Sequence, residues 1–441
     1  MRVLVTERPV EEELKNSGLS EEELKQVTVV MVEEGRHALA LLSAARFDHP
    51  AKKLVMIGVT GTKGKTTTTH MIRAILLAAG KKVGMIGTTG TVIGDVVTPT
   101  LNTTPESYEL HQAFAQMVEA GCEYAVMEVS SQGIKMHRTD GLYFNYAIFT
   151  NISPDHIGPG EHADFEEYLY YKTRLLNMCG IGLVNKDDEH APQIIKAANC
   201  ELYTYSEESK EADFVASDIR YVSQPDFVGT EFHISGKYDM EVRLGIPGLF
   251  NVVNALAAVS VCSFLGLDQA RISHALENIR VNGRMEIVYT SERCTVLVDY
   301  AHNAVSMESL LSTLRDYKPK RLVCVFGCGG NRSKDRRYSM GEIGGKMADL
   351  SIITADNSRY EKVEDIIADI RGSIEKTGGK FIEIPDRREA IRYSILHAQP
   401  GDMVAVIGKG HEDYQEINGV RHHFLDREVI EETVKELGEK A

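Results

Sequence analysis

A glycine-rich segment that ends in a lysine and a threonine is the clearest chemical motif of the chain. Its residues are Gly58-Val59-Thr60-Gly61-Thr62-Lys63-Gly64-Lys65-Thr66. Backbone N–H groups of such a loop surround phosphate oxygens, and the amino end of the following helix adds positive potential. Lys65 would then reach the terminal phosphates, and the Thr66 hydroxyl would ligate Mg²⁺. The motif predicts a nucleotide-phosphate site, with a solvated turn as the alternative because Val59 replaces the usual first glycine.

Polar residues follow two later apolar runs. Glu128 lies near the end of the run 124–129, and Asp155 and His156 follow the run 146–150. A carboxylate and an imidazole near phosphate oxygens suit divalent cations. Taken alone, a histidine after a strand is more often structural, and Lys172 in the helix-like stretch 165–178 would be a solvated surface residue. Only the combination of these residues favours a catalytic site.

These residues require a sheet that brings strand ends together. Short apolar runs alternate with amphipathic stretches from about residue 53, and a second series begins near residue 295. This pattern is typical of parallel strands covered by helices on both faces, and such sheets bind ligands at the carboxyl ends of the strands. We therefore predict an α/β fold with two consecutive doubly wound domains. The expected parts are a short N-terminal segment with mostly helical patterns over 1–50, a central domain over 51–281 and a C-terminal domain over 282–441.

The composition limits the class of protein. The chain has 441 residues and a formal net charge of -15, which argues against a nucleic-acid surface because such a surface needs a basic patch. No apolar run approaches the roughly 18 residues that span a bilayer, and the N-terminus lacks a signal peptide's apolar stretch. The seven cysteines lack the spacing of a zinc site. We expect a cytoplasmic monomer that acts on small molecules, without nucleic-acid or membrane partners.

The order of several motifs resembles the Mur ligase family of cell-wall synthesis. Besides the phosphate loop, the matching segments are Asn102-Thr103-Thr104-Pro105, Met127-Glu128-Val129-Ser130-Ser131 and Phe149-Thr150-Asn151-Ile152-Ser153-Pro154-Asp155-His156. The resemblance runs from about residue 34 to about residue 430 and is nearest to the tripeptide-forming branch. It implies a P-loop ATPase domain followed by a Rossmann-like ligase domain. Such a ligase uses ATP to activate a carboxylate as an acyl-phosphate and joins it to an amine.

The resemblance implies catalytic and metal-binding roles. Lys65, Glu128, His156 and Lys172 are the implied catalytic residues. Thr66 and Glu128 resemble ligands of the Mg²⁺ on the nucleotide, and Glu128 and His156 resemble ligands of a second Mg²⁺. Lys172 lies where the family carries a carbamylated lysine, which would place a negative charge near magnesium.

The resemblance also implies nucleotide contacts in both domains. The implied ATP-binding residues are Gly61, Thr62, Lys63, Gly64, Lys65, Thr66, Thr67, Asn251, Asn254, Arg284, Asp299 and His302. Asn251 and Asn254 lie in a segment similar to the family's adenine-contacting segment. Arg284 belongs to a segment similar to the hinge into the last domain, and Asp299 corresponds to a ribose contact.

Two groups of residues are implied to bind the substrates. The first group, for an anionic peptide, is Thr103, Thr104, Ser130 and Arg138, and the second, for the incoming amino acid, is Asp356, Asn357, Arg359, Gly408 and Glu412. Asp356-Asn357-Ser358-Arg359 resembles the Asp-Asn-Pro-Arg motif of ligases that add meso-diaminopimelate, where the arginine binds a carboxylate. Glu412 would face the ammonium group. The alternative for Arg359 is a surface salt bridge with a nearby glutamate.

The sequence departs from the family at three places. About 35 residues precede the family-like segment that begins at Arg36, too few for the separate domain that binds the uridine end of the substrate. Gln132 replaces a histidine, and Ser358 replaces the proline of the motif. Three functions therefore stay open: a ligase for a muramyl-peptide substrate, a ligase for a non-UDP acid such as an amino-acid polymer, a folate-type glutamate or a secondary metabolite, and a non-catalytic ATP-binding regulatory protein. The retained second metal site counts against the third.

Overall fold

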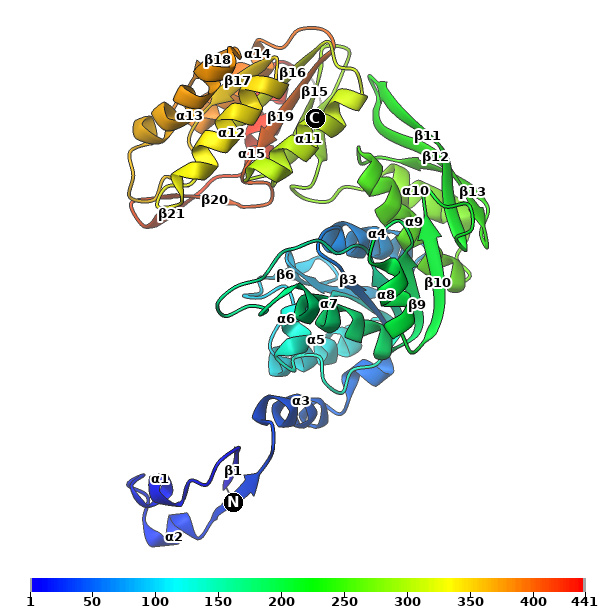
Figure 1. Cartoon of the computed structure of the whole chain (residues 1–441), viewed down its shortest axis with the longest axis vertical. Coiled ribbons are helices and arrows are strands. Elements are labelled where there is room, and N and C mark those ends of the chain that lie inside the picture. Colours follow the sequence, from blue (N-terminus) through cyan, green and yellow to red (C-terminus); the bar gives the residue numbers. More distant parts are fainter. Residues whose placement is uncertain (1, 439–441) are drawn as a thin grey trace. The chain divides into compact units, whose positions relative to one another are not determined.

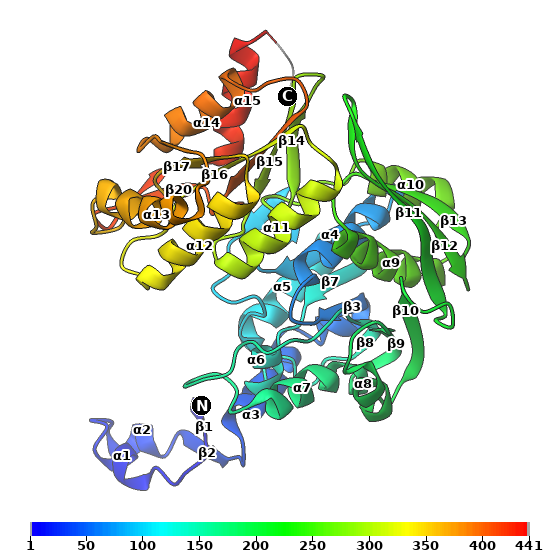
Figure 2. The same cartoon turned by 45° about the horizontal axis from the view of Figure 1, so that its top comes forward.

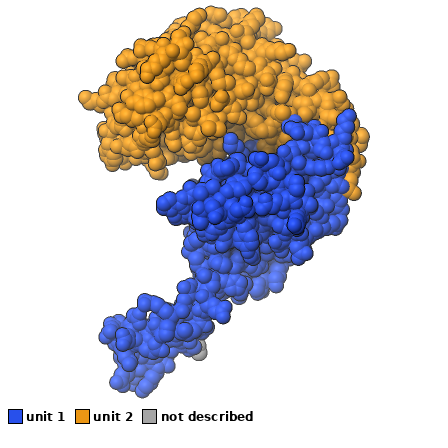
Figure 3. Space-filling model, in the orientation of Figure 1, with its two compact units in different colours: residues 1–213, 257–266 blue, residues 214–256, 267–441 orange. Residues whose placement is uncertain are grey.

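The computed structural model describes residues 2–438, which form two compact units (Figures 1 and 3). The first unit contains the residues up to 213 together with 257–266, and the second contains 214–256 together with the residues from 267 onward. Both units contain parallel strands and helices, so the predicted α/β class is confirmed. No helix among residues 2–438 combines the length and the apolar content needed to cross a bilayer.

The N-terminal part contains two strands as well as the expected helices. β1 (Arg2–Thr6) pairs in parallel with β2 (Val27–Met31), and α1 (Glu11–Lys15) and α2 (Glu21–Leu24) lie between them in the sequence. Both segments are short runs rich in β-branched residues, which is a strand signal, although the structure leaves them mostly exposed. They are followed by α3 (Gly35–Arg46) and the 3₁₀ turn η1 (Pro50–Lys53).

Eight strands of the first unit lie side by side in the order β10-β9-β8-β3-β7-β4-β5-β6. Neighbours from β10 to β4 are parallel, and β5 and β6 add antiparallel pairs at one edge. Their bounds are β3 (Val55–Thr60), β4 (Val83–Gly87), β5 (Gly90–Ile93), β6 (Val96–Thr98), β7 (Tyr124–Glu128), β8 (Phe144–Phe149), β9 (Cys179–Asn185) and β10 (Glu201–Ser206).

The position of β3 between β7 and β8 brings three strand ends together. Val59 on β3 lies opposite Glu128 on β7, and Thr60 lies opposite Phe149 on β8. The strand order reverses at β3, because β4 lies beyond β7 on one side and β9 lies beyond β8 on the other. Open α/β sheets bind ligands at such a switch point, outside the carboxyl ends of the strands.

Helices follow these strands and cover the sheet of the first unit (Figure 1). α4 (Lys65–Ala78) begins directly after the glycine-rich loop and packs on β3, β4 and β7. The other helices are α5 (Ser107–Glu119), α6 (Ser131–Lys135), α7 (Phe165–Thr173), the 3₁₀ turn η2 (Arg174–Asn177) and α8 (Ala191–Ala197). Lys172 lies in the last turn of α7 and is buried, so the interpretation of this residue as solvated is wrong.

The second unit combines antiparallel strands with a six-stranded sheet. β11 (Phe214–Gln224), β12 (Phe227–Gly236) and β13 (Met240–Leu244) are antiparallel neighbours, and α9 (Leu249–Phe264) and α10 (Gln269–Glu277) follow them in the chain. The sheet has the order β14-β15-β19-β16-β17-β18, in which only the pair β14-β15 is antiparallel. The strands are β14 (Glu286–Thr290), β15 (Cys294–Asp299), β16 (Arg321–Phe326), β17 (Leu350–Ile353), β18 (Phe381–Glu383) and β19 (Asp402–Ile407).

Helices lie on both faces of this sheet, as a doubly wound domain requires. α11, α12 and α13 lie on one face, whereas α14 and α15 lie together on the other (Figures 1 and 2). Their bounds are α11 (Ala304–Asp316), α12 (Lys334–Met347), α13 (Val363–Thr377), α14 (Arg387–Leu396) and α15 (Asp426–Glu436). A hairpin of β20 (Tyr414–Ile417) and β21 (Val420–His423) precedes α15.

A fully buried ion pair stabilises the strand ends of the second unit. Arg387 Nε and Nη2 donate to the two carboxylate oxygens of Asp426, each at 2.7 Å. The same guanidinium donates to Ala355 O at 3.2 Å and to Ile407 O at 3.0 Å. These carbonyls directly precede the motifs that begin at residues 356 and 408, so the pair positions both.

The free energy of unfolding of the Asp426→Asn variant is expected to be lower by about 3 kcal/mol, because the variant leaves the Arg387 charge buried without its partner. Urea unfolding followed by circular dichroism would measure this loss. The matched control is Glu432→Gln, which removes the exposed ion pair of the neighbouring Arg388. That pair is worth about 0–1 kcal/mol. Equal losses in the two variants would contradict the role of the buried pair.

Candidate active site

The end of β8 holds the glycine-rich loop in shape. Gly61 has a φ of 147°, and a Cβ there would lie 1.9 Å from Thr150 Oγ1, so only glycine fits. Thr150 Oγ1 donates to Lys63 O at 2.6 Å, and Asn151 Oδ1 accepts from Lys63 N at 2.9 Å. Thr150 and Asn151 therefore fix the backbone that would surround phosphates. Both residues belong to the motif 149–156, but their contacts with the loop could not be predicted from the sequence.

Glu128 and Thr66 meet at the carboxyl end of β7. Glu128 is 1% exposed, and its Oε1 accepts from Thr66 Oγ1 at 3.0 Å and from Thr88 N at 2.9 Å. Thr88 Oγ1 also donates to Glu128 Oε2 at 3.3 Å. A Cβ at Gly87 would lie 2.3 Å from Glu128 Oε1, so a larger residue there would displace the Glu128 carboxylate. Hydroxyl and carboxylate oxygens are ligands of Mg²⁺, so this donor set fits the predicted ion.

Two lysines converge on one loop carbonyl. Lys65 Nζ donates to Gly61 O at 2.8 Å and to Thr62 O at 3.1 Å, and Lys172 Nζ donates to Gly61 O at 2.7 Å. Burial, together with the nearby charge of Lys65, lowers the pKa of Lys172 well below its usual value. Lys172 is therefore more often a neutral amine than an ordinary lysine is, and the neutral amine is the nucleophilic form.

Tyr168 on α7 links Lys172 to the loop and to His156. Its hydroxyl lies 3.1 Å from Thr62 Oγ1, and Lys172 Nζ lies 4.6 Å from its ring centroid. The ring of His156 lies 6.1 Å from the same centroid. Burial raises the pKa of Tyr168 to about 12, so its hydroxyl stays protonated at neutral pH.

His156 lies at the exposed side of this group. It has a φ of 54°, and its Nδ1 lies 3.1 Å from Glu161 Oε1. Its side chain is 57% exposed. Within residues 2–438, no hydrogen bond or ion pair joins His156 to Glu128. The two implied ligands of a second ion thus lie near the same loop without touching each other.

The residues expected to contact an anionic peptide are connected to Glu128. Thr104 Oγ1 donates to Glu128 O and accepts from Ser130 N, both at 3.0 Å. Thr103 Oγ1 lies 3.0 Å from Thr88 Oγ1. Ser130 is the N-cap of α6, because its Oγ accepts from a backbone N–H three residues on.

Arg138 is held by a glutamate that the sequence analysis missed. Its Nη1 donates to Thr104 O at 3.1 Å, and its Nη2 lies 2.8 Å from Glu106 Oε1. Arg36 Nη2 lies 2.5 Å from the other oxygen of Glu106, and Arg36 Nε donates to Met136 O at 2.8 Å. Two guanidinium groups on one carboxylate leave a net positive charge, which favours an anionic ligand.

In the second unit, Asp299 and Asn251 both contact Met285. Asp299 accepts from Met285 N at 2.8 Å and from Ala301 N at 2.7 Å. Asn251 Nδ2 lies 3.9 Å from Met285 Sδ, and Asn254 Nδ2 donates to Asn251 Oδ1 at 3.2 Å. Burial raises the pKa of the Asp299 carboxyl, and the N–H group of Met285 opposes this effect.

Arg284 and His302 both contact Tyr300, the residue that follows Asp299. Arg284 Cζ lies 4.8 Å from the Tyr300 ring centroid. His302 Nδ1 lies 2.9 Å from Tyr300 O. Four implied nucleotide contacts of the second unit (Asn251, Asp299, Arg284 and His302) thus lie next to Met285 or Tyr300.

Three of the residues implied for the incoming amino acid, Asp356, Asn357 and Glu412, form one hydrogen-bonded group. Asn357 Nδ2 donates to Glu412 Oε2 at 2.9 Å, and Lys409 Nζ lies 3.3 Å from both Asn357 Oδ1 and Glu412 Oε2. Asp356 Oδ1 accepts from Asn357 N at 2.6 Å. A Cβ at Gly408 would lie 2.8 Å from Asp356 Oδ2. Lys409 was missed because nothing in the sequence signals that this lysine is fully buried.

Arg359 adjoins this group through the hairpin of β20 and β21. It has a φ of 52°, and its backbone N donates to Glu416 O at 2.9 Å. Its Nη1 donates to Gly330 O at 2.7 Å, and its Nε lies 3.6 Å from Glu416 Oε2. Arg359 therefore forms an ion pair with Glu416, in agreement with the alternative expectation of a salt bridge. The distance is too long for a hydrogen bond.

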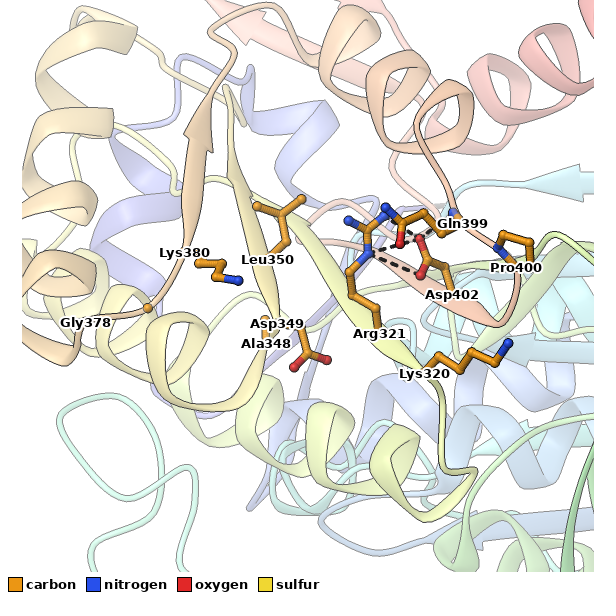
Figure 4. A pocket seen from close by; sticks show the side chains of 11 residues that line it. Lys320, Arg321, Ala348, Asp349, Leu350, Gly378, Lys380, Gln399, Pro400 and Asp402 are labelled. Carbon is orange, nitrogen blue, oxygen red and sulfur yellow. Dashed lines mark hydrogen bonds and ion pairs between the residues drawn. The ribbon is translucent and has the colours of Figure 1, made fainter.

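A cavity of about 530 Å³ lies at the amino ends of the strands in the sheet of the second unit (Figure 4). Its lining includes the first residues of β16, β17 and β19, which are Arg321, Leu350 and Asp402. Arg321 Nη2 donates to Asp402 Oδ2 at 2.5 Å. Because parallel sheets bind ligands at the carboxyl ends of their strands, this cavity is separate from the candidate site.

The sequence is similar to proteins of one family over nearly its whole length. Residues 59–262 match the Mur ligase middle domain, and residues 283–410 match the glutamate ligase domain of Mur ligases. A UDP-N-acetylmuramoyl-L-alanyl-D-glutamate–2,6-diaminopimelate ligase of Caldanaerobacter subterraneus is 39% identical over 97% of this chain and 89% of its own length. A ligase of the same name from Clostridium acetobutylicum is 40% identical over 94% of this chain and 85% of its own length. The similarity thus covers more of the chain than the range of about 34–430 predicted from the motifs. It does not show that the uridine-binding domain is missing.

Solved structures agree with this similarity. The structure of a UDP-N-acetylmuramoyl-L-alanyl-D-glutamate–2,6-diaminopimelate ligase has a TM-score of 0.74 and 30% identity, over 99% of this chain and 87% of that chain. A folylpolyglutamate synthase from Thermotoga maritima has a TM-score of 0.65 at 17% identity, over 84% of this chain and 90% of that one, which shows a shared fold. The relatives are named as ligases, so the enzymatic interpretation replaces the non-catalytic one. The chain belongs to the Mur ligase family of ATP-dependent ligases that form carbon–nitrogen bonds.

Proposed function

We propose that this chain, acting in the cytoplasm, joins a diaminopimelate-like amino acid to a carboxylate of a UDP-muramoyl dipeptide at the expense of ATP. Relatives at 39% and 40% identity carry this activity in their names. The observation that carries the proposal is the group of Lys65, Thr66, Glu128 and Lys172 at the switch point of the first sheet. It combines the cations and the oxygen ligands that phosphoryl transfer to a carboxylate requires.

The proposed reaction has two steps. A carboxylate oxygen attacks the γ-phosphorus of ATP, and ADP leaves as the acyl-phosphate forms. The amine then attacks the acyl carbon, phosphate leaves, and the amine loses a proton as the amide forms. Little covalent help is needed from the protein, so its task is to bind the charge of the transferred phosphoryl group. Lys65 and the N–H groups of the glycine-rich loop would bind that charge.

The proposed metal ligands divide between two Mg²⁺ ions. Thr66 and Glu128 would hold the ion on the nucleotide, and Glu128, His156 and Lys172 would hold the second. Bound Mg²⁺ would neutralise phosphate charge and orient the phosphate oxygens. Addition of CO₂ to the neutral amine of Lys172 forms an N–C bond and releases a proton, which turns a potential cation into an anionic ligand. The lowered pKa of Lys172 supports this step.

The incoming amino acid would bind in the second unit through Arg359 and Glu412. Within residues 2–438, the guanidinium of Arg359 donates its hydrogen bond through Nη1, so Nη2 is free to bind a carboxylate. A planar guanidinium is suited to such a group. Glu412 would accept a hydrogen bond from the ammonium group, with Asn357 and Lys409 fixing its carboxylate.

A second candidate is a ligase for an acid without UDP. One observation favours it, because Gln132 replaces a histidine of the family within the part of the first unit that would bind the acid. Gln132 Nε2 donates to Gly160 O at 3.4 Å, so it binds the loop that follows His156. The acid of this candidate would be an amino-acid polymer, a folate-type glutamate or a secondary metabolite.

ADP release with a matrix of acids and amines separates the two candidates. UDP-MurNAc-L-Ala-D-Glu would be supplied with meso-diaminopimelate, with lysine, or with neither. ADP release that requires the nucleotide-sugar dipeptide and diaminopimelate together is the expected result. Release that depends on folate-type or polymeric acids, with none from the dipeptide, would overturn the first candidate in favour of the second.

The Arg359→Ala variant is expected to raise the KM for diaminopimelate by about 10- to 100-fold. The reason is that it removes a hydrogen bond between charged groups, which is worth about 1.5–3 kcal/mol. The KM for ATP should stay unchanged, because the nucleotide residues lie elsewhere. The matched control is Arg371→Ala, which removes an exposed ion pair with Glu383 on the same unit. Equal KM values for diaminopimelate in Arg359→Ala and wild type would contradict the role of Arg359.

A further inference from the structure

Two histidines and an aspartate meet in the first unit, outside the site described above. His37 belongs to α3, and His137 and Asp140 follow α6. The Nδ1 atoms of both histidines contact the same oxygen, Asp140 Oδ2, at 2.6 Å from His37 and 2.8 Å from His137. One ligand atom from each of the three residues lies within 4.8 Å of the others.

We propose that His37, His137 and Asp140 bind a divalent transition-metal ion, of which Zn²⁺ is the prime candidate. Two imidazole nitrogens and one carboxylate oxygen suit Zn²⁺, which would complete a four-coordinate shell with water. The His37 side chain is 50% exposed, so the ion has access from solvent. Imidazole ligands favour such ions over Mg²⁺, which prefers oxygen donors like those of Thr66 and Glu128.

The backbone at His137 supports this assignment independently. His137 follows the C-cap of α6 with a φ of 56°, in the left-handed region where glycine is the usual residue. Backbone hydrogen bonds from His137 N to Ile134 O at 3.0 Å and from Arg138 N to Gly133 O at 2.9 Å hold it there. A side chain larger than glycine in this conformation stores strain, and strained residues cluster at functional positions.

Two arginines adjoin this cluster in the sequence, and their positive charges are partly compensated. Arg36 and Arg138 both bind Glu106, which balances part of their charge. A bound ion would join α3 to the turn after α6 by coordination instead of by the hydrogen bond between His37 and Asp140. It would therefore stabilise the first unit. Zinc binding is measured without nucleotide or substrate, so its test is separate from that of the proposed function.

Zinc titration of the full chain tests the proposal. The protein is stripped with a chelator and titrated calorimetrically with Zn²⁺ in the absence of nucleotide. We expect one ion per chain, with the affinity at least about tenfold weaker in His37→Ala and in His137→Ala. Zn²⁺ should raise the Tm of the wild type and leave the Tm of His37→Ala unchanged. Because His37 is half-exposed, its replacement by alanine should leave the fold intact, which circular dichroism would check.

Two histidine variants serve as matched controls. His422→Ala removes an exposed histidine of β21, and His156→Ala removes the imidazole beside Asp155 and Glu161. Both should bind Zn²⁺ like the wild type. Binding that persists in His37→Ala and His137→Ala, or that disappears in His156→Ala, would overturn the proposal. A thiolate charge-transfer band after Co²⁺ substitution would also overturn it, since no cysteine belongs to the cluster.

Discussion

The Lys65→Ala variant is expected to release ADP at a kcat/KM about 10²- to 10³-fold below wild type, the usual loss when one preorganised donor to a developing anion is removed. Lys65 Nζ lies 2.8 Å from Gly61 O, inside the loop that would surround the phosphates. Alanine removes this cation and leaves Gly61 and Gly64 in place, so the loop backbone should persist. Steady-state ADP release at saturating acid and amine would measure the loss.

The control for this variant is Lys81→Ala. Lys81 follows α4 and forms an ion pair with Glu123, with its side chain 35% exposed. Its removal should leave ADP release within about twofold of wild type, because an exposed pair is worth at most about 1 kcal/mol. ADP release by Lys65→Ala as fast as by Lys81→Ala would refute the assignment of Lys65 to the transferred phosphoryl group.

The Lys172→Ala variant is expected to lose activity by about 10²-fold or more, because it removes a group placed to become an anionic metal ligand. Lys172 donates to Gly61 O at 2.7 Å, and its lowered pKa leaves it more neutral than an ordinary lysine. Acetate should restore part of the activity of Lys172→Ala, since it supplies a carboxylate in the space of the lost side chain. Removal of dissolved CO₂ and bicarbonate should lower the activity of the wild type.

Lys172→Arg separates a role as an anion from a role as a cation. Arginine keeps the positive charge and cannot form the carbamate, so this variant should be as inactive as Lys172→Ala and should not respond to bicarbonate. An active Lys172→Arg variant would show that a cation suffices. Acetate that restores Lys65→Ala equally well would show that the rescue is unspecific.

Local sequence was sufficient for the features that depend on consecutive residues. The glycine-rich loop could be predicted because its glycines, Lys65 and Thr66 lie next to one another between a strand and a helix. Glu128 could be placed at a strand end for the same reason, since an apolar run followed by a polar residue marks the end of a buried strand, and His156 could be placed in the loop that follows the next strand. The family motifs added roles for residues far apart in the chain, such as Asn251 and Arg359.

Strand order could not be read from the sequence, and it decides which strand ends meet. Glu128 contacts Thr66 because β7 lies next to β3, and Thr150 shapes the loop because β8 lies on its other side. These contacts join residues 62 and 87 positions apart. No local pattern specifies them, because they follow from the packing of the whole sheet.

Burial was likewise decided by tertiary structure. Lysine is a residue type usually found at the surface, yet Lys172 and Lys409 are buried, at 2% and 0% exposed. β1 and β2 show the reverse, since they form a parallel pair while remaining mostly exposed. The sequence by itself determined the phosphate loop, the α/β class and the family, because these depend on residue order along the chain. The tertiary structure decided the contacts of Glu128, the environment of Lys172 and the cluster at Asp140, because each depends on groups that only folding brings together.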